Sequence, residues 1–250
     1  MTSVFIVTGT TSGLGYAFVQ EIIRKKGVIY SISRTEKEKI SSVVEKHFVC
    51  DLSEEKEVEK TIYKVFEEID FKTVESITLI NNAGTILPIG NIGTLKTKDI
   101  SNSVCTNLLA PILLSEIFIK HTQDINCSKY ILNISSGAGK KPYAGWATYC
   151  ASKAGIDLFT QCVGVEQENK KYPVKIISFA PGVVDTKMQT TIRSTPKEQF
   201  NAVTRFIDLK ENNQLLSPNF VAKTLLNLLK EGVLENGGCF DVRDFISLKQ

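Results

Sequence analysis

The sequence has few of the residues from which metal sites and disulfide scaffolds are built. Among its 250 residues are two histidines, His47 and His121, and six cysteines, at positions 50, 105, 127, 150, 162 and 239. No two cysteines are spaced as Cys-x-x-Cys, so we expect no metal site. Several cysteines stand in apolar segments, as buried thiols do in a reducing compartment, and we expect a cytoplasmic protein.

Long apolar runs and a charge excess are also absent. The longest apolar run, 108–114, has seven residues and includes a proline, far short of the roughly 18 needed to span a membrane. The N-terminus lacks the basic region, apolar stretch and cleavage site of a signal peptide. Thirty basic and 27 acidic residues give a net charge of +3, without a basic block or interleaved aromatic patch. We therefore expect neither a membrane nor nucleic acid as a partner.

Short segments rich in β-branched residues alternate with longer segments of helical periodicity. Strands are expected at 4–8, 28–33, 47–51, 76–82, 130–135, 174–180 and 239–242, and helices at 13–26, 36–46, 54–70, 97–121, 147–170 and 217–231. This alternation predicts an α/β fold with a parallel sheet and helices on both faces. No linker or repeat divides residues 1–250, so we expect a single domain. The least regular stretch, 183–216, has the length of a lid.

The first expected strand runs directly into the glycine-rich segment Thr8-Gly-Thr-Thr-Ser-Gly-Leu-Gly15, and a helix begins at its end. Gly9 permits a tight turn, Gly13 lets a pyrophosphate approach the backbone, and Gly15 allows close packing of helix on strand. The helix N-terminus offers free N–H groups to phosphates. The spacing differs from the common Gly-x-Gly-x-x-Gly, and such a loop can be a simple turn. Its strand–turn–helix setting nevertheless predicts a dinucleotide site.

The end of the second strand indicates which dinucleotide binds. An acidic residue there would bond the ribose 2′-hydroxyl of NAD and repel a 2′-phosphate. This chain has Ser31-Ile-Ser-Arg34 instead, and Arg34, Ser33 and Ser12 can donate hydrogen bonds to phosphate. Arg34 is otherwise a solvated loop residue. The pattern favours NADP(H).

Tyr149 and Lys153 lie four residues apart in the expected helix 147–170. Ser136 precedes Tyr149 by thirteen residues. The spacing of four residues places the tyrosine and the lysine on one helix face. A nearby ammonium stabilises a phenolate, and lowering a phenol pKa from 10 to near 7 needs roughly 4 kcal/mol. Alone, Tyr-x-x-x-Lys is a surface pair in most proteins. In a dinucleotide-binding chain it predicts a proton donor and acceptor for work at a carbonyl or alcohol.

These motifs, with Asn81-Asn-Ala-Gly84 and Pro181-Gly182, occur in the order and at the intervals typical of short-chain dehydrogenase/reductases. The sequence resembles that family over nearly its whole length. The resemblance implies a Rossmann-like, doubly wound domain with a seven-stranded parallel sheet in the order 3-2-1-4-5-6-7. It also implies NAD(P)-dependent hydride transfer.

The resemblance further implies a role for each matching residue. Tyr149 would protonate the carbonyl oxygen, Lys153 would lower the tyrosine pKa and bond the nicotinamide ribose, and Ser136 would stabilise charge on the substrate oxygen. Asn107 would help to hold a proton-relay water, although it can be a polar residue inside a helix. The implied cofactor-binding residues are Gly9, Thr11, Ser12, Gly13, Leu14, Gly15, Ser33, Arg34, Asp51, Leu52, Asn81, Ala83, Gly84, Tyr149, Lys153, Pro181, Gly182, Val184 and Thr186. For Asp51 the alternative is a helix N-cap.

The segments 134–143 and 179–188 resemble the sepiapterin reductase-like branch, and within it the bacillary benzil reductases that form (S)-benzoin. This likeness implies NADPH-dependent reduction of one carbonyl of an aromatic 1,2-diketone. Tyr143 and Trp146 could stack on an aryl group, although Trp146 can equally serve packing. Asp241 stands where sepiapterin reductases carry the acidic residue that holds the pterin; it can also be an ordinary aspartate at a strand end.

Three other functions stay open from the sequence. They are a pterin side-chain reductase, a 3-oxoacyl carrier-protein reductase and an NADP(H)-binding sensor without chemistry. The presence of Ser136, Tyr149 and Lys153 argues against the sensor. Helices 97–121 and 147–170 resemble those that pair across two-fold axes in the family, so we expect a homodimer or homotetramer acting on a small carbonyl substrate.

Overall fold

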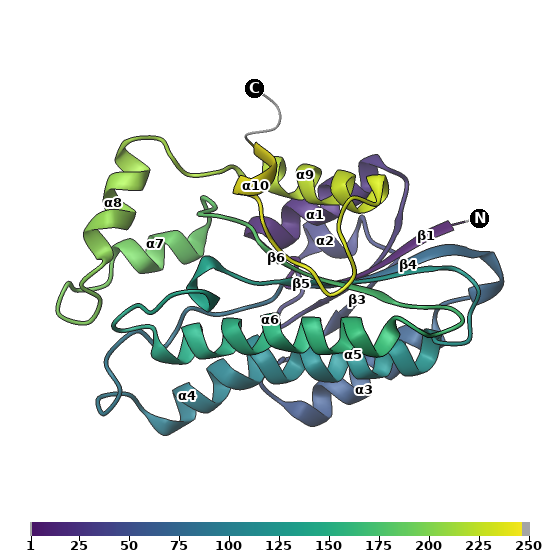
Figure 1. Cartoon of the computed structure of the whole chain (residues 1–250), viewed down its shortest axis with the longest axis horizontal. Helices are drawn as coiled ribbons and strands as arrows, with labels where there is room; N and C mark the ends of the chain where they lie inside the picture. The colour runs from purple at the N-terminus through teal and green to yellow at the C-terminus, as the bar shows by residue number, and fades with distance from the viewer. Residues whose placement is uncertain (1, 247–250) are drawn as a thin grey trace.

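Seven parallel strands form the central sheet of the protein (Figure 1). The computed structural model describes residues 2–246. The strand order is β3-β2-β1-β4-β5-β6-β7, so the expected doubly wound Rossmann-like topology is confirmed. The strands are β1 (Thr2–Thr8), β2 (Val28–Ser33), β3 (Lys46–Val49), β4 (Val74–Asn81), β5 (Ser128–Ile134), β6 (Lys175–Ala180) and β7 (Cys239–Asp241).

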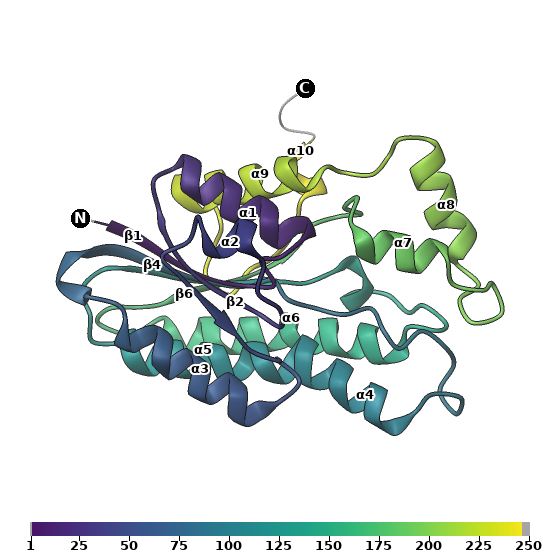
Figure 2. The same ribbon diagram turned by 180° about the vertical axis from the view of Figure 1, so that it is seen from behind.

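Helices cover both faces of the sheet, as Figures 1 and 2 show. On one face lie α1 (Gly13–Arg24), α2 (Glu38–Ser41), α9 (Pro218–Glu231) and α10 (Arg243–Ile246). On the other lie α3 (Glu55–Glu67), α4 (Thr97–Val104), α5 (Ala110–Thr122) and α6 (Ala147–Gln167). The apolar strands are buried on both sides, which requires a core on each face. Ile77 packs with Ile62 and Phe118 in one core. Ile80 packs with Phe18 and Leu225 in the other.

The parallel arrangement gathers the strand ends at one edge of the sheet. Ile6 of β1 pairs with Tyr30 of β2 on one side and with Leu79 of β4 on the other. The loops that follow β1, β2, β4, β5 and β6 therefore leave the sheet at the same edge. A crevice outside the carboxyl ends of the strands is where ligands bind in open α/β sheets.

The helix expected at 36–46 is wrong in length, because α2 spans Glu38–Ser41 alone. Ser41-Ser42 and Val43-Val44 follow, and hydroxyl-bearing and β-branched residues are weak helix formers. The chain instead enters β3 at Lys46 and pairs with Tyr30 of β2.

The helix expected at 97–121 is divided in the middle. A π-helical turn at Cys105–Leu109 separates α4 from α5. Pro111 has no N–H to give to the carbonyl of Asn107, four residues earlier, so the regular α-helical bonding is interrupted there. By length and composition the run Thr97–Thr122 could cross a membrane. Leu114 and Phe118, however, pack in the core beneath the sheet, which accounts for its apolar character.

The segment 183–216 is more regular than expected. It contains α7 (Lys187–Arg193) and α8 (Val203–Glu211), which lie together beyond one end of the sheet (Figure 1). Ile192 of α7 and Phe206 of α8 are buried in a third, smaller core with Trp146. Each helix is too short to show a long apolar stripe in the sequence, so its formation depends on tertiary packing.

Candidate functional site

A continuous cavity of about 1270 Å³ runs along the carboxyl edge of the sheet. Sites for drug-sized ligands are roughly 300–1,000 Å³, so this one has room for a dinucleotide and a second small molecule. Every cofactor, catalytic and substrate residue predicted from the sequence lines it, with two exceptions, Asn81 and Asn107.

The glycine-rich loop is shaped by close backbone contacts. Gly9 and Gly13 have φ of +73° and +56°, in the left-handed region that side chains disfavour. A Cβ at Gly9 would lie 2.9 Å from the Cα of Ala83, and one at Gly15 would collide with the Gly9 carbonyl. Ser12 precedes α1 without forming a side-chain cap, and the first turn contains no acidic residue. The N-terminal N–H groups of α1 therefore face the cavity ready for an anion, and the cradle fits a dinucleotide pyrophosphate.

The side chain of Asn81 does not line the cavity, and its predicted contact with the cofactor stays a prediction. Its side chain points into the sheet, where Nδ2 donates to Oδ1 of Asn133 at 2.8 Å. The next residue, Asn82, lines the cavity instead and was missed. Its Nδ2 donates to the carbonyl oxygens of Thr8 and Gly9 at 2.9 and 3.4 Å, which ties the glycine loop to the end of β4. The alternation of side chains along a strand is the signal that separates the two asparagines.

Ser33, Arg34 and Asp51 line the far end of the cavity, beyond β2 and β3. The Asp51 carboxylate accepts hydrogen bonds from the backbone N–H and hydroxyl of Ser53, both at 2.9 Å. The backbone bond from Ser53, and secondarily the charges of Arg34 and Lys98, lower the pKa of Asp51. Asp51 thus caps a turn ahead of α3 rather than the helix itself, whose N-cap is Glu54.

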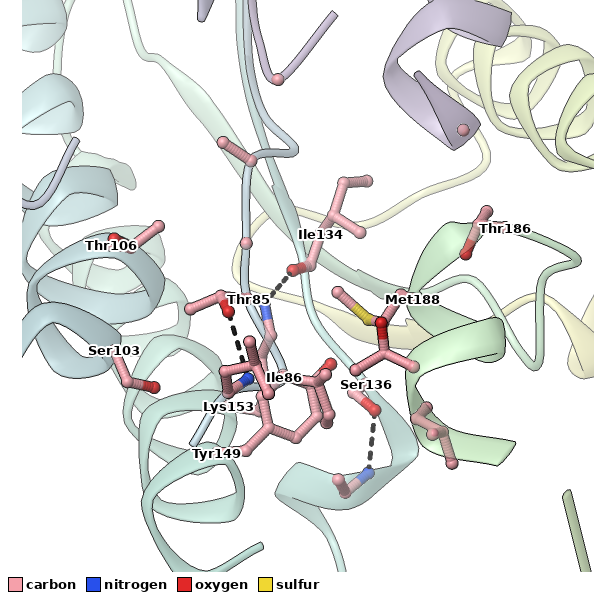
Figure 3. A pocket seen from close by; sticks show the side chains of 18 of the residues that line it. Thr85, Ile86, Ser103, Thr106, Ile134, Ser136, Tyr149, Lys153, Thr186 and Met188 are labelled. Carbon is pink, nitrogen blue, oxygen red and sulfur yellow. Dashed lines mark hydrogen bonds between the residues drawn. The ribbon is translucent and has the colours of Figure 1, made fainter. Parts of the chain in front are cut away.

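Tyr149, Lys153 and Ser136 meet at the middle of the cavity (Figure 3). Tyr149 and Lys153 come from successive turns of α6 and are 7% and 6% exposed. Lys153 Nζ donates to the carbonyl oxygen of Ile134 at 2.7 Å and lies 5.7 Å from the centre of the Tyr149 ring. Ser136 follows β5, and its side chain lies near enough to Tyr149 to lower the pKa of the phenol. The hydroxyl of Ser136 also accepts from the Ala138 N–H at 3.1 Å, which fixes its direction.

Burial determines the charge state of this pair, contrary to the expected lowering of the tyrosine pKa by the lysine. Loss of solvent raises the pKa of Tyr149 to about 12, and Ser136 offsets this in part. Loss of solvent also lowers the pKa of Lys153 to about 8, opposed by the charge of Asp157. An apolar environment disfavours both the phenolate and the ammonium, so desolvation outweighs their mutual attraction. Tyr149 is therefore a neutral proton donor at physiological pH.

The side chain of Asn107 does not reach the cavity. Its Oδ1 accepts from the Thr85 N–H, and its Nδ2 donates to the Thr85 carbonyl, both at 2.8 Å. These bonds fix the loop after β4. A Cβ at Gly84 would lie 3.1 Å from Asn107 Oδ1 and 3.9 Å from Lys153 Nζ, so Gly84 keeps this space open. These bonds give Asn107 a positioning role through Thr85, and its part in holding a proton-relay water stays a prediction.

An aromatic wall forms the remaining side of the cavity. Trp146 stacks on Phe200 with ring centres 4.2 Å apart and touches Tyr143 and Tyr149 at 5.2 and 5.8 Å. Both predicted substrate contacts, Tyr143 and Trp146, therefore line the cavity and also pack in the third core.

Asp241 faces the same cavity, but its charge is already paired. Arg243 binds its two carboxylate oxygens through Nε and Nη2 at 2.7 and 2.6 Å. Arg243, together with Arg205 of α8, lines the cavity and was not predicted, because nothing in the sequence marks an isolated arginine in a segment without recognised helices.

Comparison with known proteins agrees with this geometry. The family model described as short chain dehydrogenase matches residues 3–197. Benzil reductase ((S)-benzoin forming) of Bacillus cereus is 45% identical over 231 residues, covering 90% of this chain and 93% of that protein. Sepiapterin reductase of Mus musculus is 27% identical over 97% of both chains. The crystal structure of the KRED1-Pglu enzyme superposes with a TM-score of 0.82 at 28% identity, covering 96% of this chain and all of that one.

The matched family spans more than half of the chain, and its relatives cover almost all of it. The expected resemblance to the sepiapterin reductase-like branch and to benzil reductases is thereby confirmed. The chain belongs to the short-chain dehydrogenase family and is an oxidoreductase acting on CH–OH or carbonyl groups.

Proposed function

We propose that the protein is an NADPH-dependent carbonyl reductase that converts one carbonyl of an aromatic 1,2-diketone, such as benzil, to (S)-benzoin. One observation carries the proposal: a buried phenol, with Ser136 in the same cavity, lies between a dinucleotide cradle and an aromatic wall. The similarity to benzil reductases supports the choice of diketone.

Tyr149, Ser136 and Lys153 each have a separate role in the reduction. When bound, the reduced nicotinamide supplies a hydride, with its electron pair, to the carbonyl carbon. The C=O π pair moves to oxygen, and Tyr149 donates its proton there, because burial keeps its pKa at about 12. Ser136 donates a hydrogen bond to the same oxygen as negative charge develops. Lys153, a cation below its pKa of about 8, stabilises the phenolate left behind until solvent returns a proton.

The choice of NADPH rests on the end of the cavity beyond β2. Arg34 is exposed there beside Ser33, and neither residue at 33 or 34 is acidic. A guanidinium forms paired, charge-assisted bonds to phosphate, whereas the hydroxyl of NAD gains little from it. Asp51 and Leu52 would flank the adenine, and Pro181, Gly182, Val184 and Thr186 the nicotinamide.

A pterin side-chain reductase is the second candidate. The position of Asp241 in the cavity favours it, together with the similarity to sepiapterin reductase. The bidentate bond from Arg243 weighs against it, because a pterin would have to displace the guanidinium to reach the carboxylate.

We also propose that the protein is a single-domain, cytoplasmic homodimer or homotetramer. All six cysteines are free thiols, as in a reducing compartment. On α6, Leu158 and Val165 are 61% and 65% exposed and face away from the sheet. Sedimentation equilibrium would give a mass of two or four chains, whereas a mass of one chain would contradict the proposal.

The substrate and cofactor are tested together in a panel of assays. Benzil, sepiapterin and a 3-oxoacyl thioester would each be offered with NADPH and with NADH, and benzoin would be resolved by chiral chromatography. We expect the fastest turnover with benzil and NADPH and an excess of (S)-benzoin. Faster reduction of the thioester, or a preference for NADH, would contradict the proposal.

A further inference from the structure

Arg205 presents a cation at the mouth of the cavity. It lies on α8, and its Nη1 donates to the hydroxyl of Tyr143 at 2.7 Å. Its guanidinium carbon lies 5.7 Å from the centre of the Phe206 ring. Within residues 2–246 no carboxylate lies within ion-pair distance of Arg205. One guanidinium nitrogen of Arg205 is thus bonded to Tyr143, while its other N–H groups remain available to a ligand.

Lys141 brings a second cation to the same wall residue. Its Nζ lies 5.9 Å from the centre of the Tyr143 ring, and Lys141 also lines the cavity. No salt bridge is formed by Lys141 in the part of the chain that the structure describes. Tyr143 therefore carries one cation at its hydroxyl and another over its face. We refer to Arg205 and Lys141 as the mouth pair.

The surrounding charges leave the mouth positive. Lys187, at the start of α7, also lines the cavity. The nearby acid, Asp241, is bound through both oxygens by Arg243. A carboxylate that reached Arg205 and Lys141 would meet two cations without a salt-bridge partner in residues 2–246, and the low-dielectric aromatic wall would strengthen the attraction.

Two aromatic side chains, Tyr143 and Trp146, connect the mouth pair to the reacting group. Tyr143 contacts Trp146 with ring centres 5.2 Å apart, and Trp146 contacts Tyr149 at 5.8 Å. A ketone whose oxygen meets Tyr149 would lie along this wall, and a substituent on its distal ring would point toward Arg205.

We propose that the mouth pair is a subsite for an anionic group, and that the substrate class is aryl ketones carrying a carboxylate distal to the reacting carbonyl. The carboxylate is bound but not changed; the ketone is reduced as described above. The kinetic readout rests on the proposed reductase function. The subsite itself concerns binding and can be measured without turnover.

The test compares benzil-4-carboxylate with its methyl ester, which has the same shape without the charge. We expect kcat/KM for the acid to exceed that for the ester about tenfold at low ionic strength, equivalent to about 1.4 kcal/mol, because the bond from Arg205 is charge-assisted. Arg205→Gln retains a donor for Tyr143 without the charge, and should lower the acid-to-ester ratio to about one. Arg205→Lys should restore part of it, and Lys141→Gln should lower it about threefold.

Lys197→Gln is the matched control, because Lys197 is an exposed cation between α7 and α8 that does not line the cavity. It should leave the acid-to-ester ratio unchanged. A wild-type ratio of one, or a ratio that Arg205→Gln does not alter, would overturn the subsite. If Arg205→Gln lowers kcat/KM equally for the acid and the ester, the ratio is unaltered and the subsite is also overturned. Such a result would show that Arg205 only holds Tyr143 in place.

Binding provides a readout that does not need catalysis. Trp146 is the sole tryptophan of the chain and lines the cavity, so its fluorescence reports ligands on the wall. If neither compound is reduced, the proposed function fails. Tighter binding of the acid than of the ester, lost in Arg205→Gln, would still support the subsite, and equal affinities would overturn it.

Discussion

The ammonium group of Lys153 lies 5.7 Å from the centre of the Tyr149 ring and is anchored by a 2.7 Å hydrogen bond to the Ile134 carbonyl. The two side chains occupy one face of α6 and are almost fully buried. Burial moves their pKa values in opposite directions, up for Tyr149 and down for Lys153, because it disfavours the charged form of each. The phenol stays protonated, and the amine titrates near physiological pH.

This relationship predicts how ketone reduction depends on pH. The pKa of Lys153 is about 8, so the stabilising cation is present below that pH and is lost above it. Tyr149, with a pKa of about 12, does not ionise in this range. We therefore expect kcat/KM to be level below pH 8 and to fall above it, approaching tenfold per pH unit. Lys153→Arg, a permanent cation, should shift the decline to higher pH. A wild-type kcat/KM that rises through pH 8 would contradict the assignment.

Charge reversal at Arg34 should change the cofactor preference. Arg34→Asp replaces a phosphate donor by an acid that repels the 2′-phosphate and accepts from a ribose hydroxyl. We expect kcat/KM for NADPH to fall roughly 100-fold, equivalent to about 2.7 kcal/mol, with little loss for NADH. Lys39→Asp makes the same change on α2, outside the cavity, and controls for long-range charge. An equal loss for both cofactors in Arg34→Asp would indicate a general effect on folding.

A buried lysine away from the cavity contributes to stability. Lys129, only 2% exposed, donates from Nζ to the carbonyls of Thr122, Gln123 and Ile125 at 3.1, 3.3 and 2.8 Å. These groups end α5, where a cation is favoured and carbonyls lack helical partners. Lys129→Met removes these three hydrogen bonds without replacing them, and we expect a loss of about 2–3 kcal/mol in the free energy of unfolding. Lys120→Met, exposed on the same helix, should change it by less than about 0.5 kcal/mol in urea titrations.

The sheet and the central motifs were predictable because their signals are local. Strand β1 contains the continuous apolar run 4–7, and α9 is marked by Ser217, Pro218 and Gly232 at its ends. Ser217 accepts from the Phe220 N–H, and Gly232 takes φ of +71°. Capping residues of this kind begin and end a helix whatever the surrounding tertiary structure, so they can be recognised in the sequence.

The remaining features depend on contacts between distant segments. The pKa of Tyr149 follows from how completely the surrounding elements bury it, which the Tyr-x-x-x-Lys spacing does not contain. Arg205 gains its place from Tyr143, 62 residues earlier. The neighbouring asparagines 81 and 82 point in different directions at the end of β4, and motif matching alone did not single out Asn82.

The most direct test of the account removes a single oxygen atom. Tyr149→Phe retains the ring and its packing against Trp146 but cannot donate a proton. We predict that NADPH binding, followed by quenching of Trp146 fluorescence or by calorimetry, stays within about twofold of wild type. Turnover of benzil should fall at least about 1,000-fold, at the middle of the 10²–10⁴ that positioned proton transfer contributes. A variant that keeps more than a tenth of the wild-type kcat would contradict the assignment of Tyr149 as the proton donor.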